Sequence, residues 1–189
     1  MRIRSLAFAL VAFFVSSPQA RGEDVSVPIG LQAELLAKLA SYDRNLAARA
    51  GDRVRIAIIA RSSDASSARA AAQMQKALST IADVGGLAHD ETIVTYSDSR
   101  SIAELCKQRR ITIAYVTPGL AEEAGPMAKA FAGLDLLSVA GSAADVSSGI
   151  VVGFDLVSGK PKLVVHLTRA KSQNVSFRAE VLKLMRVVE

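Results

Sequence analysis

Apolar positions along the chain follow two alternating patterns. One consists of short, nearly continuous runs rich in β-branched residues, which are typical of parallel strands buried on both faces. The predicted strands are residues 54–60, 92–96, 111–116 and 136–140. Between them, apolar residues recur at helical spacing. The predicted helices are residues 68–81, 102–109 and 120–132. Strands that alternate with helices of about ten residues predict right-handed crossovers, and so a Rossmann-like, mostly parallel sheet flanked by helices.

The segment before the first strand predicts a leading helix. Apolar residues recur at helical spacing over residues 31–50, and Gly51 follows as a stop signal. Asp43 and Arg44 occupy polar positions in this repeat and are assigned to a solvated face.

The C-terminal quarter predicts an antiparallel β-hairpin followed by a closing helix. Residues 150–157 and 162–168 are strand-like and flank the turn residues 158–161 (SGKP). A polar linker, residues 169–174, comes next. Apolar positions in residues 175–188 are then spaced by three and four, as on one face of a helix.

The N-terminus has the layout of a secretory signal peptide. Arg2 and Arg4 precede a compact apolar run, residues 6–15, and small residues extend to Ala20. The run is too short to span a bilayer, which needs about 20 residues. The alternative is a buried N-terminal helix. The expected organisation is therefore a signal peptide over residues 1–20, a leader over residues 21–30, and a single α/β domain over residues 31–189.

Composition excludes some classes of function. The net charge of +5 falls to +3 without Arg2 and Arg4, and the basic residues are scattered among acids, so nucleic-acid binding is not expected. No other run has transmembrane length, so membrane insertion after signal cleavage is not expected. With Cys106 as the one cysteine, an intramolecular disulfide cannot form.

Candidate ligand contacts follow the predicted strands, because ligands of open α/β sheets bind at the carboxyl ends of the strands. The polar residues there are Ser62, Ser63, Asp64, Ser97, Asp98, Ser99 and Thr117. Together with helix N-termini they could hold a small anion or polar solute. The favoured interpretation is helix capping, since every helix needs caps. A second candidate surface is the polar linker, with Arg169, Lys171 and Asn174.

Catalytic and cofactor motifs are not found. The turn after Ala60 has no glycine, which disfavours dinucleotide binding, and no P-loop occurs. His89 and His166 are far apart in sequence, so a metal site is not expected. Cys106 falls inside a predicted helix, where its pKa would not drop, so a thiol dyad is disfavoured. The tripeptide 89–91 (HDE) is interpreted as a surface loop. We therefore expect no enzyme activity and no cofactor.

The chain resembles the YfiR/HmsC family of bacterial periplasmic proteins over residues 35–188. The motif is the C-terminal block: residues 149–154 (GIVVGF), 162–167 (KLVVHL) and 181–188 (VLKLMRVV). Cys106 before a buried strand and the leading helix also fit. The chain departs from the family in lacking the Trp-Pro of the first helix. It also has His166 where an Asn is usual, and one cysteine where cyclase-regulating members have several. A redox-controlled role is therefore not carried over.

The resemblance implies a non-enzymatic periplasmic protein. Characterised relatives bind the periplasmic sensor domain of a membrane-bound diguanylate cyclase and repress it, which affects cyclic-di-GMP signalling and biofilm formation. The expected partner is therefore an inner-membrane sensor protein, such as a diguanylate cyclase or a histidine kinase. The alternative is a single-lobe periplasmic protein that binds a small solute and is related to ABC-transporter binding proteins. Oligomeric state is left open, with a homodimer among the alternatives.

Overall fold

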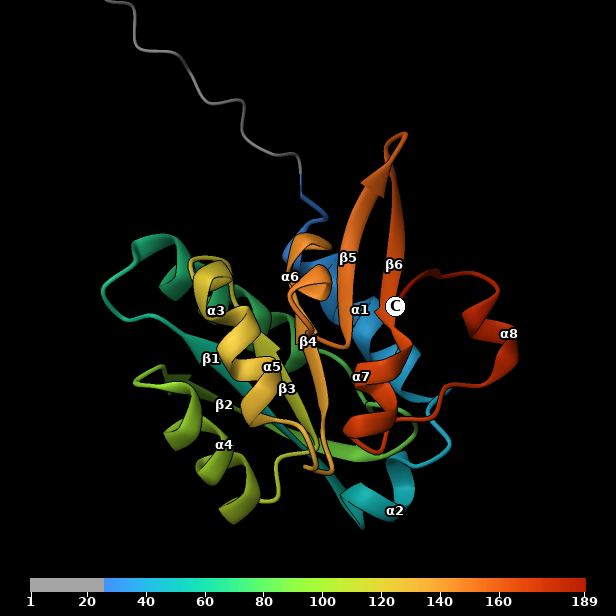
Figure 1. The fold of residues 1–189 in the computed structure, drawn as a ribbon, viewed down its shortest axis with the longest axis horizontal. Coiled ribbons are helices and arrows are strands. Elements are labelled where there is room, and N and C mark those ends of the chain that lie inside the picture. Colours follow the sequence, from blue (N-terminus) through green and yellow to red (C-terminus); the bar gives the residue numbers. More distant parts are fainter. Residues whose placement is uncertain (1–25) are drawn as a thin grey trace, which may run out of the picture.

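A computed structural model describes residues 26–189. The predicted signal peptide and the first half of the leader lie outside the described residues. The sheet has seven strands in the order β2-β1-β3-β4-β5-β6-β7 (Figure 1). The strands are β1 Arg53–Ala60, β2 Ala88–Thr95, β3 Ile113–Val116, β4 Leu137–Ala140, β5 Val152–Val157, β6 Lys160–His166 and β7 Arg186–Val188. The helices are α1 Ile29–Ala40, α2 Leu46–Ala50, α3 Ala65–Leu78, α4 Ser99–Gln108, η1 Ala121–Glu123, α5 Ala124–Ala130, α6 Ala144–Ser147, α7 Leu167–Ser172 and α8 Ala179–Leu182.

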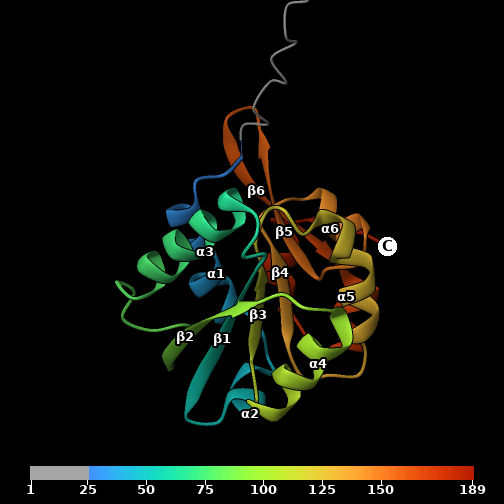
Figure 2. The same cartoon turned by 90° about the vertical axis from the view of Figure 1, so that its left-hand side faces the viewer.

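Helices cover both faces of the sheet (Figure 2). Side chains of a strand alternate between faces, so Ile56 and Ile58 enter one core while Ala57 and Ile59 enter the other. The first core is closed by α1, α3 and the segment after β6. The second core is closed by α4 and α5. The predicted Rossmann-like, mostly parallel sheet flanked by helices is confirmed.

The order of the strands creates a topological switch point between β1 and β3. The first five strands pair in parallel, with β2 on one side of β1 and β3 on the other. The chain leaves β1 through α3 on one face and reaches β3 through α4 on the opposite face. In such sheets a crevice forms at the carboxyl ends of the two strands where the direction of winding reverses.

The predicted hairpin is confirmed, and the predicted closing helix is wrong. β5 and β6 pair antiparallel around Ser158 and Gly159, both of which have positive φ, as a two-residue turn requires. After β6, the expected linker forms α7. The expected helix is reduced to the four residues of α8, followed by β7. The backbone of β7 pairs with the open edge of β6, and this tertiary contact overrides the helical spacing.

Two further predictions are corrected. The single leading helix is wrong, because the chain turns at residues 41–45 and separates α1 from α2. The tripeptide 89–91 is not a loop, since it lies inside β2. That strand is at the edge of the sheet and pairs with β1 alone. Five of its eight residues are therefore exposed, and its sequence lacks the apolar run of a buried strand.

Asp43 explains the break in the leading helix. Its side chain is fully buried and not solvated, and it forms an ion pair with Arg49 of α2, whose side chain is 2% exposed. The Asp43 carboxylate also accepts the backbone N–H groups of Asn45 (3.1 Å) and Ser176 (3.0 Å). Arg49 in turn donates to the carbonyl oxygen of Asn174 at 3.1 Å. One buried carboxylate therefore connects the turn after α1 with the segment after α7.

Backbone hydrogen bonds extend this connection. The N–H of Arg44 donates to the carbonyl of Ser176 at 2.9 Å, and the N–H of Arg178 donates to the carbonyl of Tyr42 at 2.9 Å. Asp43 and Phe177 form the antiparallel bridge between the two segments. We call this junction of residues 42–49 with residues 174–178 the Asp43 clasp.

We predict that Asp43→Ala lowers the free energy of unfolding by about 3–5 kcal/mol, because it leaves the guanidinium of Arg49 buried without a counter-ion. Urea denaturation measures the loss. The control is Arg44→Ala, whose exposed side chain should matter by less than about 0.5 kcal/mol. A loss below about 1 kcal/mol for Asp43→Ala would contradict the clasp.

Candidate functional site

The carboxylates predicted at the ends of β1 and β2 act as helix caps. Asp64 accepts the backbone N–H groups of Ser66 (2.8 Å) and Ser67 (3.1 Å) at the start of α3. Asp98 accepts the N–H groups two and three residues ahead, both at 3.0 Å, at the start of α4. The capping interpretation accounts for both carboxylates. The neighbouring Ser62, Ser63 and Ser97 are exposed.

Hydrogen bonds also lower the pKa of both caps. The Ser66 hydroxyl, followed by the N–H groups of Ser67 and Ser66, holds the pKa of Asp64 below its ordinary value. The hydroxyl and then the N–H of Ser101 do the same for the pKa of Asp98. Both carboxylates are therefore stabilised in their charged form at the N-termini of the helices, where negative charge is favoured.

Thr117 lies at the switch point but is buried. Its hydroxyl donates to the carbonyl of Ile59 at 2.9 Å and lies 2.7 Å from the Ser67 hydroxyl. Ser67 in turn accepts the backbone N–H of Arg61 at 2.9 Å. Gly119, with φ +88°, lies so close that a Cβ there would be 2.5 Å from Oδ2 of Asp64. These contacts join the loops after β1 and β3 directly.

An ion pair connects the same two loops at the carboxyl ends of β1 and β3. Arg61 donates to Glu123 at 3.2 Å and to the carbonyl of Gly119 at 3.2 Å, and its guanidinium lies 5.8 Å from the ring centroid of Tyr96. The Tyr96 hydroxyl donates to Glu123 at 2.7 Å and lies 3.1 Å from the hydroxyl of Ser99. The polar side chains at the switch point are thus hydrogen-bonded to one another, while the side chains of Arg61 and Glu123 remain 36% and 29% exposed.

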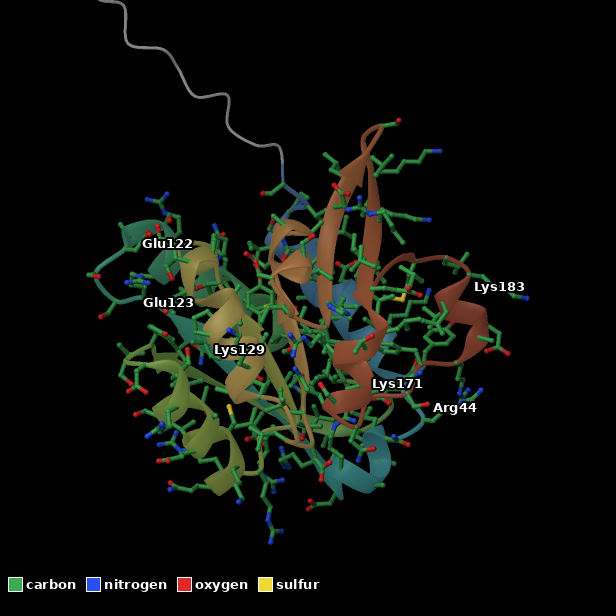
Figure 3. All side chains as sticks on the ribbon, viewed as in Figure 1. Arg44, Glu122, Glu123, Lys129, Lys171 and Lys183 are labelled. Carbon is green, nitrogen blue, oxygen red and sulfur yellow. The ribbon has the colours of Figure 1, made fainter. Side chains whose placement is uncertain are left out.

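The three residues of the second predicted surface lie in different environments. Arg169 is half-buried on α7, and its guanidinium lies against Gly149. Lys171 is exposed on the same short helix (Figure 3). Asn174, although exposed, donates to Asp135 at 3.0 Å and accepts the side-chain amide of Asn45 at 2.9 Å. Asn174 therefore belongs to the Asp43 clasp.

A buried polar cluster at the ends of β3 and β4 was not predicted. The Tyr115 hydroxyl donates to Gln32 of α1 at 2.7 Å, and Gln32 donates to the carbonyl of Val27 at 2.7 Å. Asp145 of α6 is buried nearby, and burial raises its pKa. Burial, and then the charge of Asp145, raises the pKa of Tyr115. In sequence, these residues lie within apolar or loop segments, so no local pattern brings them together.

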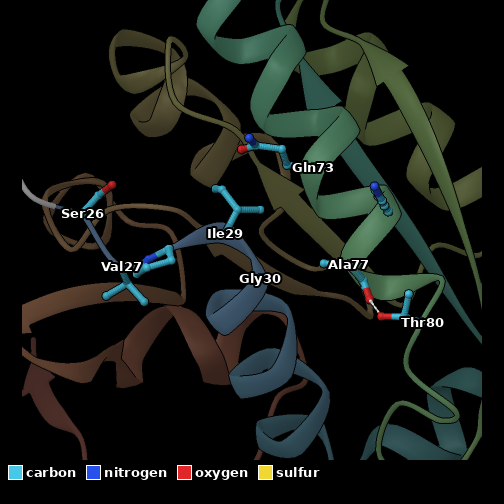
Figure 4. A pocket seen from close by; sticks show the side chains of 9 residues that line it. Ser26, Val27, Ile29, Gly30, Gln73, Ala77 and Thr80 are labelled. Carbon is cyan, nitrogen blue, oxygen red and sulfur yellow. Dashed lines mark hydrogen bonds between the residues drawn. The ribbon is translucent and has the colours of Figure 1, made fainter.

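Several surface depressions border α1. One, of about 680 Å³, lies between the start of α1 and α3, and its lining includes Val27, Ile29, Gln73 and Ala77 (Figure 4).

Another depression, of about 300 Å³, lies between α1, β6 and α8, and we call it the α1–β6 groove. Its lining residues are Leu35, Lys38, Leu39, Tyr42, Pro161, Lys162, Leu163, Val181 and Leu184. Leu184 is 69% exposed, the largest value among the exposed large hydrophobic residues of the described chain. The groove is therefore an open, mostly apolar surface.

Two kinds of reactive group, a cysteine nucleophile and a metal centre, can be assessed in the described residues. Burial raises the pKa of the Cys106 thiol to about 12, so this thiol stays protonated and is a poor nucleophile. Within residues 26–189, no group of three or more His, Cys, Asp or Glu side chains could hold a metal ion. No helix in that range is long and apolar enough to cross a membrane.

Comparison with known proteins places this fold in context. A family model described as YfiR/HmsC-like matches residues 30–186. No curated protein matches the chain.

Three solved structures have similar folds. The ABC domain from Streptococcus pneumonia in complex with L-Trp has a TM-score of 0.60 and 14% identity, over 85% of this chain and 60% of that one. A conserved domain protein from Vibrio cholerae has a TM-score of 0.56 and 16% identity, over 88% and 61%. A ligand-free, open substrate-binding protein with adhesive properties from Clostridium difficile has a TM-score of 0.56 and 16% identity, over 87% and 60%. At these identities the similarity shows the fold alone, and the chain spans about three-fifths of each protein.

Two carboxylates should affect stability with opposite dependence on pH. The pKa of Asp64 is lowered by folding, so its contribution is present above the unfolded pKa of about 3.9 and is lost as pH falls through the folded value. The pKa of Asp145 is raised, so its contribution is present below about 3.9 and is lost as pH rises through the folded value.

We predict that, relative to wild type, Asp64→Asn loses stability as the pH rises from about 3 to about 7, whereas Asp145→Asn gains stability. Asparagine still caps a helix, so Asp64→Asn reports on charge. The melting temperature of each protein across this range measures both trends. If both variants change in the same direction, the assigned shifts are wrong.

Proposed function

The chain belongs to the YfiR/HmsC-like family, whose model matches residues 30–186, and on this premise we propose that it is a periplasmic, non-enzymatic regulatory protein. It acts by contact with the periplasmic part of an inner-membrane sensor, such as a diguanylate cyclase or a histidine kinase. The expected signal peptide at residues 1–20 supports export. Binding regulates the sensor only if the protein has different affinities for two states of the sensor.

The observation that carries this proposal is the α1–β6 groove. Three apolar side chains, Leu35, Leu163 and Leu184, come from three separate elements and reach one open surface. Exposed apolar patches bordered by polar groups are typical of protein–protein contact sites. The polar residues at the carboxyl edge of the sheet are instead occupied with each other, as the pairs Arg61–Glu123 and Ser67–Thr117 illustrate.

Solute binding is the second candidate, favoured by the likeness to an ABC domain in complex with L-Trp and to a substrate-binding protein. This chain covers only 60% of each of those chains, so a whole-protein activity does not transfer directly. A solute at the carboxyl edge would have to displace the Arg61–Glu123 pair. Regulation by protein contact requires no such displacement and is therefore preferred.

We predict that the tagged mature protein recovers a membrane protein with a periplasmic sensor domain from detergent-solubilised inner membranes, and that Leu184→Glu reduces the recovery at least about tenfold. A carboxylate at this exposed apolar position would have to be desolvated in the contact. Quantitative mass spectrometry measures the recovery.

The matched control is Val157→Glu, which makes the same change at a residue that is 52% exposed and does not line the groove. It should retain recovery. Failure of wild type to recover any membrane protein would contradict the proposed function. Equal losses for the two variants would contradict the assignment of the groove.

A further inference from the structure

The outer edge of β2 carries main-chain groups that no strand of residues 26–189 covers. β2 is the first strand in the order of the sheet and pairs with β1 alone (Figure 2). The N–H of Tyr96, just after β2, donates to the carbonyl of Ala60 of β1 at 2.8 Å. Since the main-chain groups of successive residues in a strand point to alternate sides, those of Glu91, Ile93 and Thr95 point away from β1. A further strand could pair with these groups.

β2 lacks the usual protection of an edge strand. Edge strands are commonly protected by proline, lysine, a bulge or a short length. The eight residues of β2 include neither proline nor lysine, and they pair with β1 without a bulge. Two side chains cover part of its first half, since Arg53 donates to the carbonyl of His89 at 3.2 Å and Gln75 to that of Glu91 at 3.4 Å. The open part of the edge is therefore the second half, around Ile93, which is 39% exposed.

The open edge of β2 matches a second copy of itself. A two-fold axis at Ile93 places β2 antiparallel to β2 of the other copy, with Ile93 opposite Ile93 and Glu91 opposite Thr95. All of these residues have outward-pointing main-chain groups, as hydrogen-bonded pairs of an antiparallel ladder require. At two hydrogen bonds per pair, the contact gains about six main-chain hydrogen bonds. The shared segment, residues 92–95 (TIVT), is β-branched throughout, which favours paired strands.

Charge favours this register over its neighbours. Asp90 and Glu91 lie in the first half of β2, and residues 92–95 carry no charge. An axis at Ile93 therefore places the acidic half of each strand against the uncharged half of the other, and the two exposed isoleucines cover each other. An axis at Glu91 would oppose two carboxylates, which is destabilising. An axis at Thr92 would place each carboxylate of Glu91 opposite Ile93.

We propose that the protein forms a two-fold dimer in which β2 pairs antiparallel with β2 of a second copy, centred on Ile93. The contact joins two seven-stranded sheets into one continuous sheet. Because it uses the same edge of both copies, it closes at the dimer and leaves no β2 edge open for a third. The α1–β6 groove lies beside β6, toward the other end of the strand order, so the dimer presents two open grooves. The inference does not depend on what binds in them.

Sedimentation velocity of the mature protein tests the contact. Wild type should sediment as a dimer at about 100 μM and dissociate on dilution. Ile93→Lys should raise the dissociation constant at least about tenfold, because lysine on an edge strand opposes pairing. The control, Val157→Lys, makes the same change at a residue that is 52% exposed at the tip of the hairpin. It should leave the dissociation constant unchanged.

Cysteine cross-linking tests the register without a disruptive substitution. Burial raises the pKa of the native Cys106 thiol to about 12, so this thiol does not compete for the reagent. Directly opposite residues have Cβ atoms about 5 Å apart, so a short thiol cross-linker should join Ile93→Cys to its copy. Two Thr95→Cys residues would lie four residues apart along the ladder, at about 14 Å, and should not be joined.

Three results would overturn the proposal. The first is a wild type that remains a monomer at about 100 μM. The second is a dimer in which Thr95→Cys is cross-linked and Ile93→Cys is not. The third is a dimer that Leu184→Lys dissociates and Ile93→Lys does not, which would place the contact between copies in the α1–β6 groove.

Discussion

The buried carboxylate of Asp43 is the contact on which the α1–β6 groove depends. It neutralises Arg49 and accepts a backbone N–H from each of two segments that are more than 130 residues apart in the chain. A buried charge is stable only when it is paired and hydrogen-bonded, so these contacts must form together or not at all. The result is a fixed position for residues 174–178 relative to the end of α1.

The fixed position of residues 174–178 determines the shape of the α1–β6 groove. α8 has only four residues and could not hold a helical conformation alone. It is kept in place by the clasp before it, by Val181 and Met185 in the core, and by β7 after it, which pairs with β6. Because α8 is positioned in this way, Leu184 stands opposite Leu35 and Leu163 across an open groove. The C-terminal segment thus adds an open apolar groove, the proposed contact surface, to the edge of an ordinary α/β sheet. At the carboxyl edge, where such sheets usually bind ligands, Arg61 and Glu123 form an ion pair.

Local signals made much of the fold predictable, and long-range contacts account for what was missed. The apolar runs of β1 and β3 and the capping carboxylates Asp64 and Asp98 depend on neighbouring residues, and they were found from sequence. The break after α1 was not predicted. Asp43 is polar and lies at a helical position, and the Ser176 N–H that it accepts comes from a segment distant in sequence. The apolar spacing of residues 186–188 suits a helix or a strand, and their pairing with the open edge of β6 makes them a strand. The groove could not be predicted, since its residues come from three elements that no local pattern relates.

Site-specific photo-crosslinking in living cells tests the central claim most directly. A photoreactive amino acid replaces Leu184 in the groove, Val157 at the tip of the hairpin, or Asp98 at the carboxyl edge of the sheet. The proposed contact predicts that only position 184 yields an adduct with an inner-membrane sensor protein. An adduct with such a sensor from position 98, with none from position 184, would contradict the account and move the functional surface back to the ends of the strands.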